Sequence, residues 1–174
     1  GTAADLQKHG EDMGFGVTIA PLVEAAGEHV SSTRIRDALT AGHPEKAASM
    51  LGHMHRIEGE VVRGDQRGRE LGYPTANMMI TGLHPPKFGV YAVRVEVRTG
   101  DHAGRYDGVA SLGIRPMFEG DVPNLETFLF DFAGDLYGTD LSVSLVSYLR
   151  PEVKFDSLEA LIAQMDKDSM QARQ

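Results

Sequence analysis

The pattern of apolar and polar residues changes character near residue 50. Before that point, apolar side chains recur at helical spacing, with Ser31 or Ser32 as a cap and Gly14 and Gly42 as stops. The predicted elements are helices over Ala3–Met13, Thr33–Thr40 and Glu45–Leu51, and one short strand over Gly16–Ala20. One strand and three short helices cannot form a sheet with both faces covered. We therefore interpret residues 1–50 as an incomplete piece of an α/β domain.

From about His55 the apolar positions alternate instead. Between Gly89 and Arg98, for example, the valines fall on one face and the charged residues on the other. The predicted strands are Arg56–Arg63, Gly89–Arg98, Tyr106–Leu112, Leu125–Phe132 and Leu141–Leu149. Five or six strands without intervening helices predict an antiparallel sheet that curls into a barrel or sandwich.

The C-terminal residues predict one amphipathic helix. Asp156 and Glu159 form a start that resembles a capping box. The apolar stripe consists of Phe155, Leu158, Leu161, Ile162 and Met165. We expect this helix to pack on the barrel as a structural element.

Composition narrows the functional classes. The 174 residues are 41% hydrophobic and 24% charged, with a net charge of −8 and no cysteine. The absence of cysteine excludes a disulfide scaffold and a cysteine nucleophile. The acidic balance argues against a general nucleic-acid binder, such as an oligonucleotide-binding barrel, but leaves room for a small phosphorylated ligand on a local basic loop. No apolar run approaches the roughly 20 residues of a membrane helix, and no signal peptide opens the chain, so we predict a cytoplasmic protein.

The glycine-rich segment from Gly64 to Asn77 is the most informative stretch. Its glycines, Gly64, Gly68 and Gly72, allow sharp turns that bring backbone N–H groups close to a ligand. The interleaved side chains are Arg67 and Arg69, which suit phosphate oxygens, and Thr75 and Asn77, which suit a hard cation such as Mg²⁺. A flexible hairpin loop explains the same composition.

Glu126 is the second candidate. Strand alternation places it on the same face as Phe128, Phe130 and Phe132. A carboxylate on an aromatic face is paired, protonated or functional, and such a group can act as the general base for an alcohol. The alternative is an edge-strand glutamate that reaches solvent at the rim.

A third candidate lies at the start of a predicted helix. The hydroxyls of Ser31, Ser32 and Thr33, followed by Arg34 and Arg36, form a pattern that suits an anion. Helix capping and solvated arginines explain it equally well.

Taken in order, these segments resemble one family. The stretch from about Leu51 to Lys167 is similar to the riboflavin kinase module of bacterial bifunctional riboflavin kinase/FAD synthetases. The matching segments are Gly59–Gly64, Arg67–Arg69, Leu71–Asn77, Gly89–Tyr91, Gly113–Pro116, Glu126, Asp131–Gly138 and Leu149–Phe155.

The resemblance implies a six-stranded antiparallel Greek-key barrel with a C-terminal helix, spanning residues 51–174. It implies an enzyme that binds Mg-ATP and riboflavin in adjoining sites and releases FMN and ADP. Thr75 and Asn77 match the family's Mg²⁺-binding positions, and Glu126 matches the base for the ribityl 5′-hydroxyl. The loop from Gly64 to Gly72 matches the flap over the phosphates.

Flavin contacts are implied at Gly89, Val90, Tyr91, Arg115 and Phe118. Three positions depart from the family pattern, and they bear on the flavin side of the site. Ser111 stands where asparagine is common, Met117 where threonine is common, and Phe128 where histidine is common. A catalytically silent flavin- or nucleotide-binding barrel is the alternative, although it has no need of the base.

Residues 1–50 resemble the end of the FMN adenylyltransferase domain of the same family, a nucleotidyltransferase-like fragment. Ser31, Ser32, Thr33 and Arg36 match that domain's second phosphate-binding motif, whereas its His-x-Gly-His motif is absent. We therefore expect the rest of that domain to be the partner of this chain within a longer parent protein. We also expect that these 174 residues alone make no FAD.

Overall fold

A computed structural model describes residues 1–174 except 22, 26, 65–72 and 118–119. The chain forms two compact units, residues 1–30 and 31–174. The first contains α1 (Ala3–Met13) and a short hairpin of β1 (Glu24–Ala25) and β2 (Glu28–His29). The predicted strand over Gly16–Ala20 is wrong, because that segment finds no pairing partner among the described residues.

The second unit begins with two short helices, α2 (Ser32–Ala41) and α3 (Pro44–Leu51). They pack on each other through Ala38, Leu39 and Ala47. Leu39 also joins them to the segment before the fifth strand, since its carbonyl accepts a 2.9 Å bond from the backbone N–H of Lys87. The packing boundary therefore lies at residue 30, whereas the sequence places the domain boundary at residue 50.

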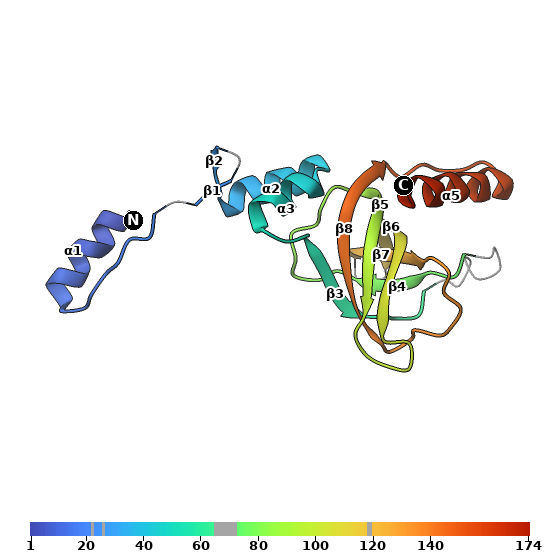
Figure 1. Ribbon diagram of the computed structural model, residues 1–174, viewed down its shortest axis with the longest axis horizontal. Coiled ribbons are helices and arrows are strands. Elements are labelled where there is room, and N and C mark those ends of the chain that lie inside the picture. Colours follow the sequence, from blue (N-terminus) through green and yellow to red (C-terminus); the bar gives the residue numbers. More distant parts are fainter. Residues whose placement is uncertain (22, 26, 65–72, 118–119) are drawn as a thin grey trace. The chain divides into compact units, whose positions relative to one another are not determined.

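Six antiparallel strands form the body of the second unit (Figure 1). Their bounds are β3 (Arg56–Glu60), β4 (Ala76–Met79), β5 (Gly89–Val97), β6 (Gly104–Met117), β7 (Gly120–Leu129) and β8 (Asp140–Arg150). The spatial order β3-β8-β5-β6-β7-β4 contains the Greek-key arrangement, because β8 returns to lie beside β5. A bridge between Val62 and Asn77 brings the two edges together and nearly closes the barrel.

The predicted Greek-key barrel with a C-terminal helix is confirmed, and so are the five predicted strands, with ends that differ by a few residues. The sixth strand, β4, lies within the segment that the sequence predicts as part of a glycine-rich loop. Strand alternation fills the interior with apolar side chains. Tyr91, Leu112, Leu125 and Leu141 are among those fully buried there.

The alternation on β7 ends earlier than predicted. Glu126 and Phe128 share the outer face of the barrel, and the ring of Phe130 contacts that of Phe128. Phe132, in contrast, packs against the core cluster. The strand ends at Leu129, and Asp131 adopts a left-handed backbone conformation (φ 55°) that redirects the chain. The predicted face of three phenylalanines is therefore wrong for Phe132.

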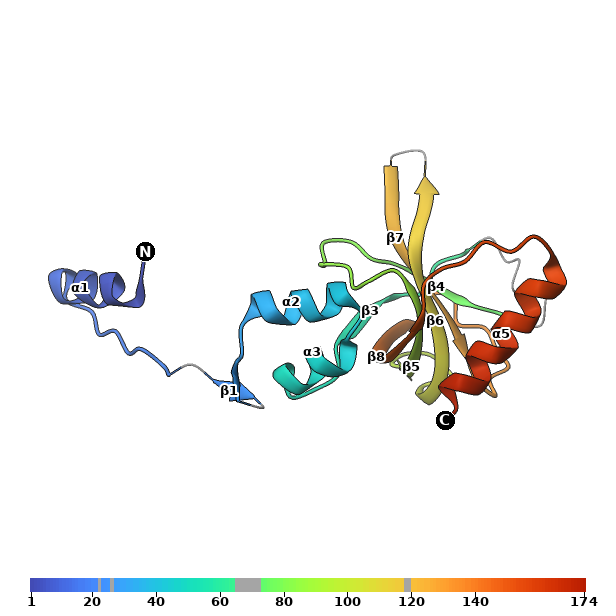
Figure 2. The same cartoon turned by 90° about the horizontal axis from the view of Figure 1, so that it is seen from above.

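The C-terminal helix, α5 (Leu158–Ala172), lies against the outer face of the barrel (Figure 2). Its N-cap is Ser157, whose hydroxyl accepts a bond from the N–H of Ala160, so the predicted start at Asp156 is one residue early. Near its end, Arg173 makes two bonds of 2.9 and 3.0 Å to Asp131. These contacts hold both the strand turn and the helix in place.

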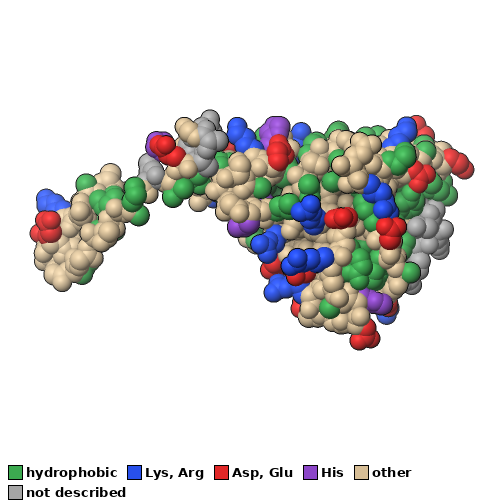
Figure 3. Space-filling model, viewed as in Figure 1, with side chains coloured by type: hydrophobic (Ala, Val, Ile, Leu, Met, Phe, Trp, Pro, Cys, Tyr) green, Lys and Arg blue, Asp and Glu red, His purple; other side chains and the backbone are tan. Residues whose placement is uncertain are grey.

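Charged side chains of both signs intermingle over the barrel face shown in Figure 3. Arg98, which follows β5, lies 3.1 Å from Glu58 on β3, for instance. Such a mixed surface differs from the continuous basic groove of a nucleic-acid binder. In the part of the chain that the structure describes, no helix has the length and apolar character to cross a bilayer.

The barrel interior should govern stability. Replacing the fully buried Leu125 by alanine removes packed methyl groups, and we expect the free energy of unfolding to fall by about 2–5 kcal/mol. Urea denaturation measures this change. Leu83→Ala is the matched control, because Leu83 is half exposed and should change stability little. Equal losses in both variants would contradict the assignment of the core.

Candidate active site

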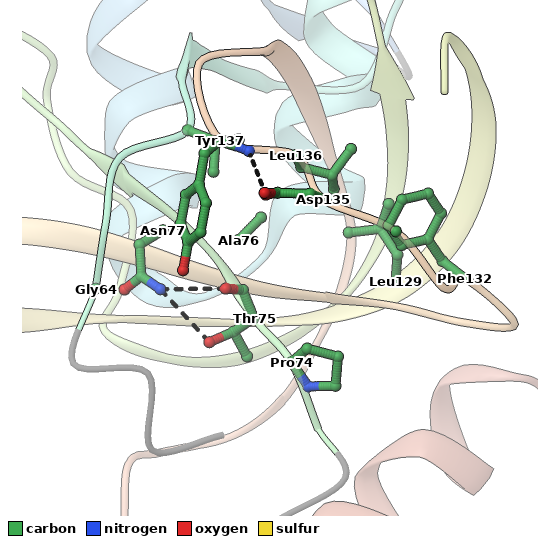
Figure 4. Close-up of a pocket in the computed structure, with 12 residues that line it drawn as sticks. Gly64, Pro74, Thr75, Ala76, Asn77, Leu129, Phe132, Asp135, Leu136 and Tyr137 are labelled. Carbon is green, nitrogen blue, oxygen red and sulfur yellow. Dashed lines mark hydrogen bonds between the residues drawn. The ribbon is translucent and has the colours of Figure 1, made fainter. Parts of the chain in front are cut away.

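Two cavities meet at the edge of the barrel near β4. The first, which we call the loop cavity, is a narrow space of about 50 Å³ beside the turn that follows β7. Figure 4 shows its lining residues, which converge from β4, the segments before it and the turn. They are Val61, Gly64, Pro74, Thr75, Ala76, Asn77, Leu129, Phe132, Gly134, Asp135, Leu136 and Tyr137.

The polar end of the loop cavity is formed by Thr75 and Asn77. The amide nitrogen of Asn77 lies 3.3 Å from the carbonyl oxygen of Thr75 and 3.5 Å from its hydroxyl (Figure 4). Gly64 is pressed against this amide, because a Cβ at that position would lie 2.5–2.8 Å from it. The glycine therefore leaves the space that the Asn77 side chain occupies.

The second cavity, which we call the helix cavity, has a volume of about 310 Å³ and lies between the outer face of the sheet and α5. Its lining combines Tyr73, Thr75, Val90, Val109, Ser111, Glu126 and Phe128 with Arg150, Glu152, Val153, Phe155, Leu161, Met165, Asp168 and Ser169. Eight of these residues are apolar or aromatic, and the other seven are polar or charged. This is the usual character of a site for a small organic ligand.

A buried ion pair forms the floor of the helix cavity. Asp168, on α5, is 4% exposed and accepts three bonds of 2.6–3.0 Å from the guanidinium of Arg150. Gln164 donates a further bond of 2.9 Å to the same carboxylate. Because removal of either charged partner would leave a buried charge uncompensated, this pair ties α5 firmly to β8.

Thr75 lines both cavities, so it marks their junction. Asn77 is paired in register with Glu126 across β4 and β7, and the side chain of Asn124 lies between them. The amide nitrogen of Asn124 donates to Asn77 Oδ1 at 3.2 Å and to Glu126 Oε1 at 3.3 Å. The candidate cation ligands and the candidate base thus belong to one hydrogen-bonded chain.

The structure describes some of the predicted site residues but not others. Thr75, Asn77 and Gly64 come together, and Glu126 lies beside them in the adjoining cavity. The other predicted phosphate-binding residues, Arg67, Gly68, Arg69 and Gly72, lie outside the described residues, as do Phe118 and the side chain of Arg115.

Of the predicted flavin contacts, Val90 lines the helix cavity. Gly89, next to it, admits no side chain, because a Cβ there would lie 2.4 Å from the carbonyl oxygen of Arg150. Tyr91 points into the barrel, is 0% exposed and donates its hydroxyl hydrogen to the carbonyl oxygen of Lys87. Burial raises the pKa of Tyr91, so its phenol stays neutral. The side chain packs inside the barrel, behind the strand that carries Val90.

The predicted phosphate motif on α2 lies at a helix start. Ser31 is the N-cap of α2, and its hydroxyl accepts a 3.2 Å bond from the N–H of Arg34. Ser32, Thr33 and Arg36 follow within the first turns of the helix. None of these residues lines either cavity. Their role in phosphate binding stays a prediction.

Sequence reasoning missed the contribution of α5. Leu161 and Met165 belong to the predicted apolar stripe, yet they line the helix cavity rather than only pack on the barrel. Tyr73 was also missed. Its ring lies 4.8 Å from that of Phe128, and its hydroxyl donates to Asp166 on α5. Helical periodicity predicted the apolar stripe that contains Leu161 and Met165, but it could not show that a cavity separates this stripe from the sheet.

Residues 51–174 match the riboflavin kinase (flavokinase) family. The chain belongs to this family. A bifunctional riboflavin kinase/FMN adenylyltransferase of Listeria monocytogenes is 39% identical over 175 residues, which cover 99% of this chain and 54% of the relative. The enzyme of the same description from Escherichia coli K12 is 41% identical over 169 residues, which cover 97% of this chain and 53% of the relative.

Among solved structures, a crystal structure described as a macrolide-efflux protein from Streptococcus pneumoniae is similar to this riboflavin kinase family member, with a TM-score of 0.82 and 36% identity. The similarity covers 99% of this chain and 55% of that one. The chain thus spans about half the length of the relatives that it matches.

The bond between Tyr73 and Asp166 has a measurable signature. It raises the pKa of Tyr73 to about 12, above the ordinary value of 10.0, because the phenol donates to a carboxylate. The deprotonated form is disfavoured in the folded state, so the stabilisation is present below pH 10 and is lost as the pH rises through about 12.

In Asp166→Ala we expect Tyr73 to titrate near the ordinary value of 10.0. Alkaline titration of tyrosinate absorbance measures the change, and Tyr73→Phe identifies the group that moves. Asp156→Ala serves as the control, since Asp156 is an exposed carboxylate before α5. A titration curve of Asp166→Ala that matches the unsubstituted protein would contradict the contact.

Proposed function

We propose that this chain transfers the γ-phosphoryl group of ATP to the ribityl 5′-hydroxyl of riboflavin and releases FMN and ADP. Membership of the riboflavin kinase family supports the reaction. The observation that carries the assignment is the junction at Thr75, where two cavities of different character meet beside Glu126. A phosphoryl donor and an acceptor bound on either side of Thr75 would meet there.

We assign the nucleotide phosphates to the loop cavity. There they would bind a Mg²⁺ ion held by Thr75 and Asn77. The donor set fits such an ion, because a hydroxyl and an amide oxygen are hard, neutral ligands that leave the negative charge to the phosphates. The close approach of Gly64 to the Asn77 amide supports a cradle shaped around that side chain. When bound, the ion would supply charge neutralisation on the transferred phosphoryl group.

We assign the flavin to the helix cavity. Its aromatic and aliphatic walls, with Phe128 and Tyr73 on one side and Leu161 and Met165 on the other, suit a flat ring system. Ser111 and Phe128, which depart from the family pattern, both line this cavity. Their placement supports the expectation that the departures affect flavin contacts rather than the phosphates.

The chemical step forms no covalent bond between the protein and either substrate. The ribityl oxygen attacks the γ-phosphorus, the bond from that phosphorus to the bridging oxygen of ADP breaks, and the hydroxyl proton passes to Glu126. Glu126 is exposed in the helix cavity, so its carboxylate is accessible to a bound alcohol. Asn124 holds one of its oxygens at 3.3 Å and thereby fixes its orientation.

The catalytically silent binding barrel is disfavoured by the same arrangement. A module that only binds flavin needs the helix cavity but has no use for a carboxylate placed beside a candidate cation site. An oligonucleotide-binding barrel is disfavoured by the mixed charge of the visible face (Figure 3) and the net charge of −8.

We propose further that residues 1–50 derive from an FMN adenylyltransferase domain of a longer parent protein that also makes FAD from FMN. Two observations support this. The similarity to bifunctional relatives covers 97–99% of the chain and therefore includes these residues. The first unit also leaves large apolar side chains exposed, as expected of a fragment from a larger core. They are Leu6, Met13, Phe15, Ile19 and Val23.

The reaction can be tested directly. Incubation with riboflavin, ATP and Mg²⁺ should yield FMN and no FAD, as separated by chromatography. Glu126→Gln keeps the shape of the side chain but removes the base, so we expect kcat to fall about 10²- to 10⁴-fold. Glu96→Gln is the control, because Glu96 is an exposed carboxylate on β5 outside both cavities. Absence of FMN with the folded, unsubstituted chain would contradict the proposal.

The cradle at Gly64 gives an independent prediction. In Gly64→Ala the new methyl group must displace the Asn77 amide, so we expect KM for Mg-ATP to rise about tenfold while KM for riboflavin changes little. Gly59→Ala is a matched control on β3, where a Cβ would meet only Met78 Sδ at 3.8 Å. The same rise for both nucleotide and flavin would show general damage rather than a local effect.

A further inference from the structure

The chain contains only two asparagines, Asn77 and Asn124, and they contact each other. Both are almost completely buried, with exposed fractions of 5% and 4%. They lie on neighbouring strands, β4 and β7, on the face that carries Glu126. A pair of buried amides is costly unless their hydrogen bonds are made. The hydrogen-bond partners of these two amides therefore indicate what role the pair has.

The bonds of Asn124 are divided between two functional candidates. Its amide nitrogen donates one bond to Asn77 Oδ1 and another to Glu126 Oε1, at 3.2 and 3.3 Å. Its Oδ1, in contrast, is buried without a hydrogen-bond partner among the described residues. An apolar residue of similar size would avoid that cost. The value of this amide thus lies in orienting its neighbours rather than in stability.

The unpaired oxygen also permits a second arrangement. As described, Asn77 presents its amide nitrogen to the hydroxyl of Thr75. A half-turn of both amides would point Asn77 Oδ1 toward Thr75 and let the Asn77 nitrogen donate to Asn124 Oδ1. Two oxygens, from Thr75 and Asn77, would then face a cation together. The same turn would withdraw the Asn124 nitrogen from Glu126 and release that carboxylate toward its substrate.

We propose that Asn124 is a positioning residue that couples the Asn77 amide at the cation site to the Glu126 carboxylate. This inference rests on the proposed function, since it takes Asn77 as a ligand and Glu126 as the base. Asn124 touches neither substrate in this scheme, because it lines neither cavity. It acts by setting the orientation of the two groups on either side of it.

The first test needs no turnover. Protein labelled with nitrogen-15 at asparagine has only two side-chain amide groups to observe by NMR. We expect the Asn124 amide signals to move in Glu126→Gln, because this substitution replaces the carboxylate that accepts the bond from the Asn124 nitrogen. Addition of Mg²⁺ and ADP should move the Asn77 and Asn124 amides together. An Asn124 amide that responds neither to Glu126→Gln nor to the nucleotide would overturn the proposal.

The second test uses kinetics. Asn124→Leu should keep the fold and lower kcat about 10- to 100-fold, the loss typical of removing an outer partner of a ligand. In the Glu126→Gln background the same substitution should cost no more than about twofold, because the two residues act as one unit. A full additional loss in that background would overturn the coupling.

Thr127→Val is the matched control for both tests. Thr127 is on the same strand, is fully buried and has a hydroxyl without a hydrogen-bond partner among the described residues, but it faces the barrel interior. It should leave kcat and the two amide signals unchanged. If the unsubstituted chain makes no FMN, the proposed function fails, whereas the NMR test still decides the amide coupling.

Discussion

The register between β4 and β7 is the constraint on which the site depends. These strands pair so that Asn77 lies opposite Glu126, while Met78 and Leu125 point into the barrel. A slip of one residue would exchange the two faces, since side chains alternate with a period of two. The interior positions would then become polar, and the site residues would be buried in place of the core. Core packing and site geometry are therefore fixed by the same set of backbone hydrogen bonds.

The helix cavity depends on a second, non-local interaction, the docking of α5. Three polar contacts hold this helix against the barrel, through Asp166, Asp168 and Arg173. Between these contacts the helix stands away from the sheet and leaves the space that we assign to flavin. The polar contacts attach α5 to the barrel and also keep it at a distance from the sheet. A helix held by apolar packing alone would pack directly on Phe128 and Val109.

The sequence predicted most of the barrel because strand alternation is a local signal. It missed β4, which has only four residues and follows a glycine- and proline-rich segment typical of a loop. It misplaced Phe132 because nothing local announces the left-handed conformation of Asp131. Thr75, Asn77 and Glu126 were candidates from residue type and strand alternation, and the family resemblance gave each of them a role. The roles of Asn124 and α5 depend on contacts between segments far apart in the chain, and no periodicity encodes those.

The position of α5 in the chain has a consequence for folding. All six strands precede it, so the barrel can close as soon as β8 has paired with β3 and β5. At that stage the outer face with Phe128 and Val109 is bare, and Arg150 has no carboxylate partner from α5. During synthesis, which proceeds from the N-terminus, a nascent chain would thus carry the paired Thr75 and Asn77 side chains but only one wall of the helix cavity. The cavity that we assign to flavin becomes complete only when α5 docks, so under this assignment flavin binds after the barrel has closed.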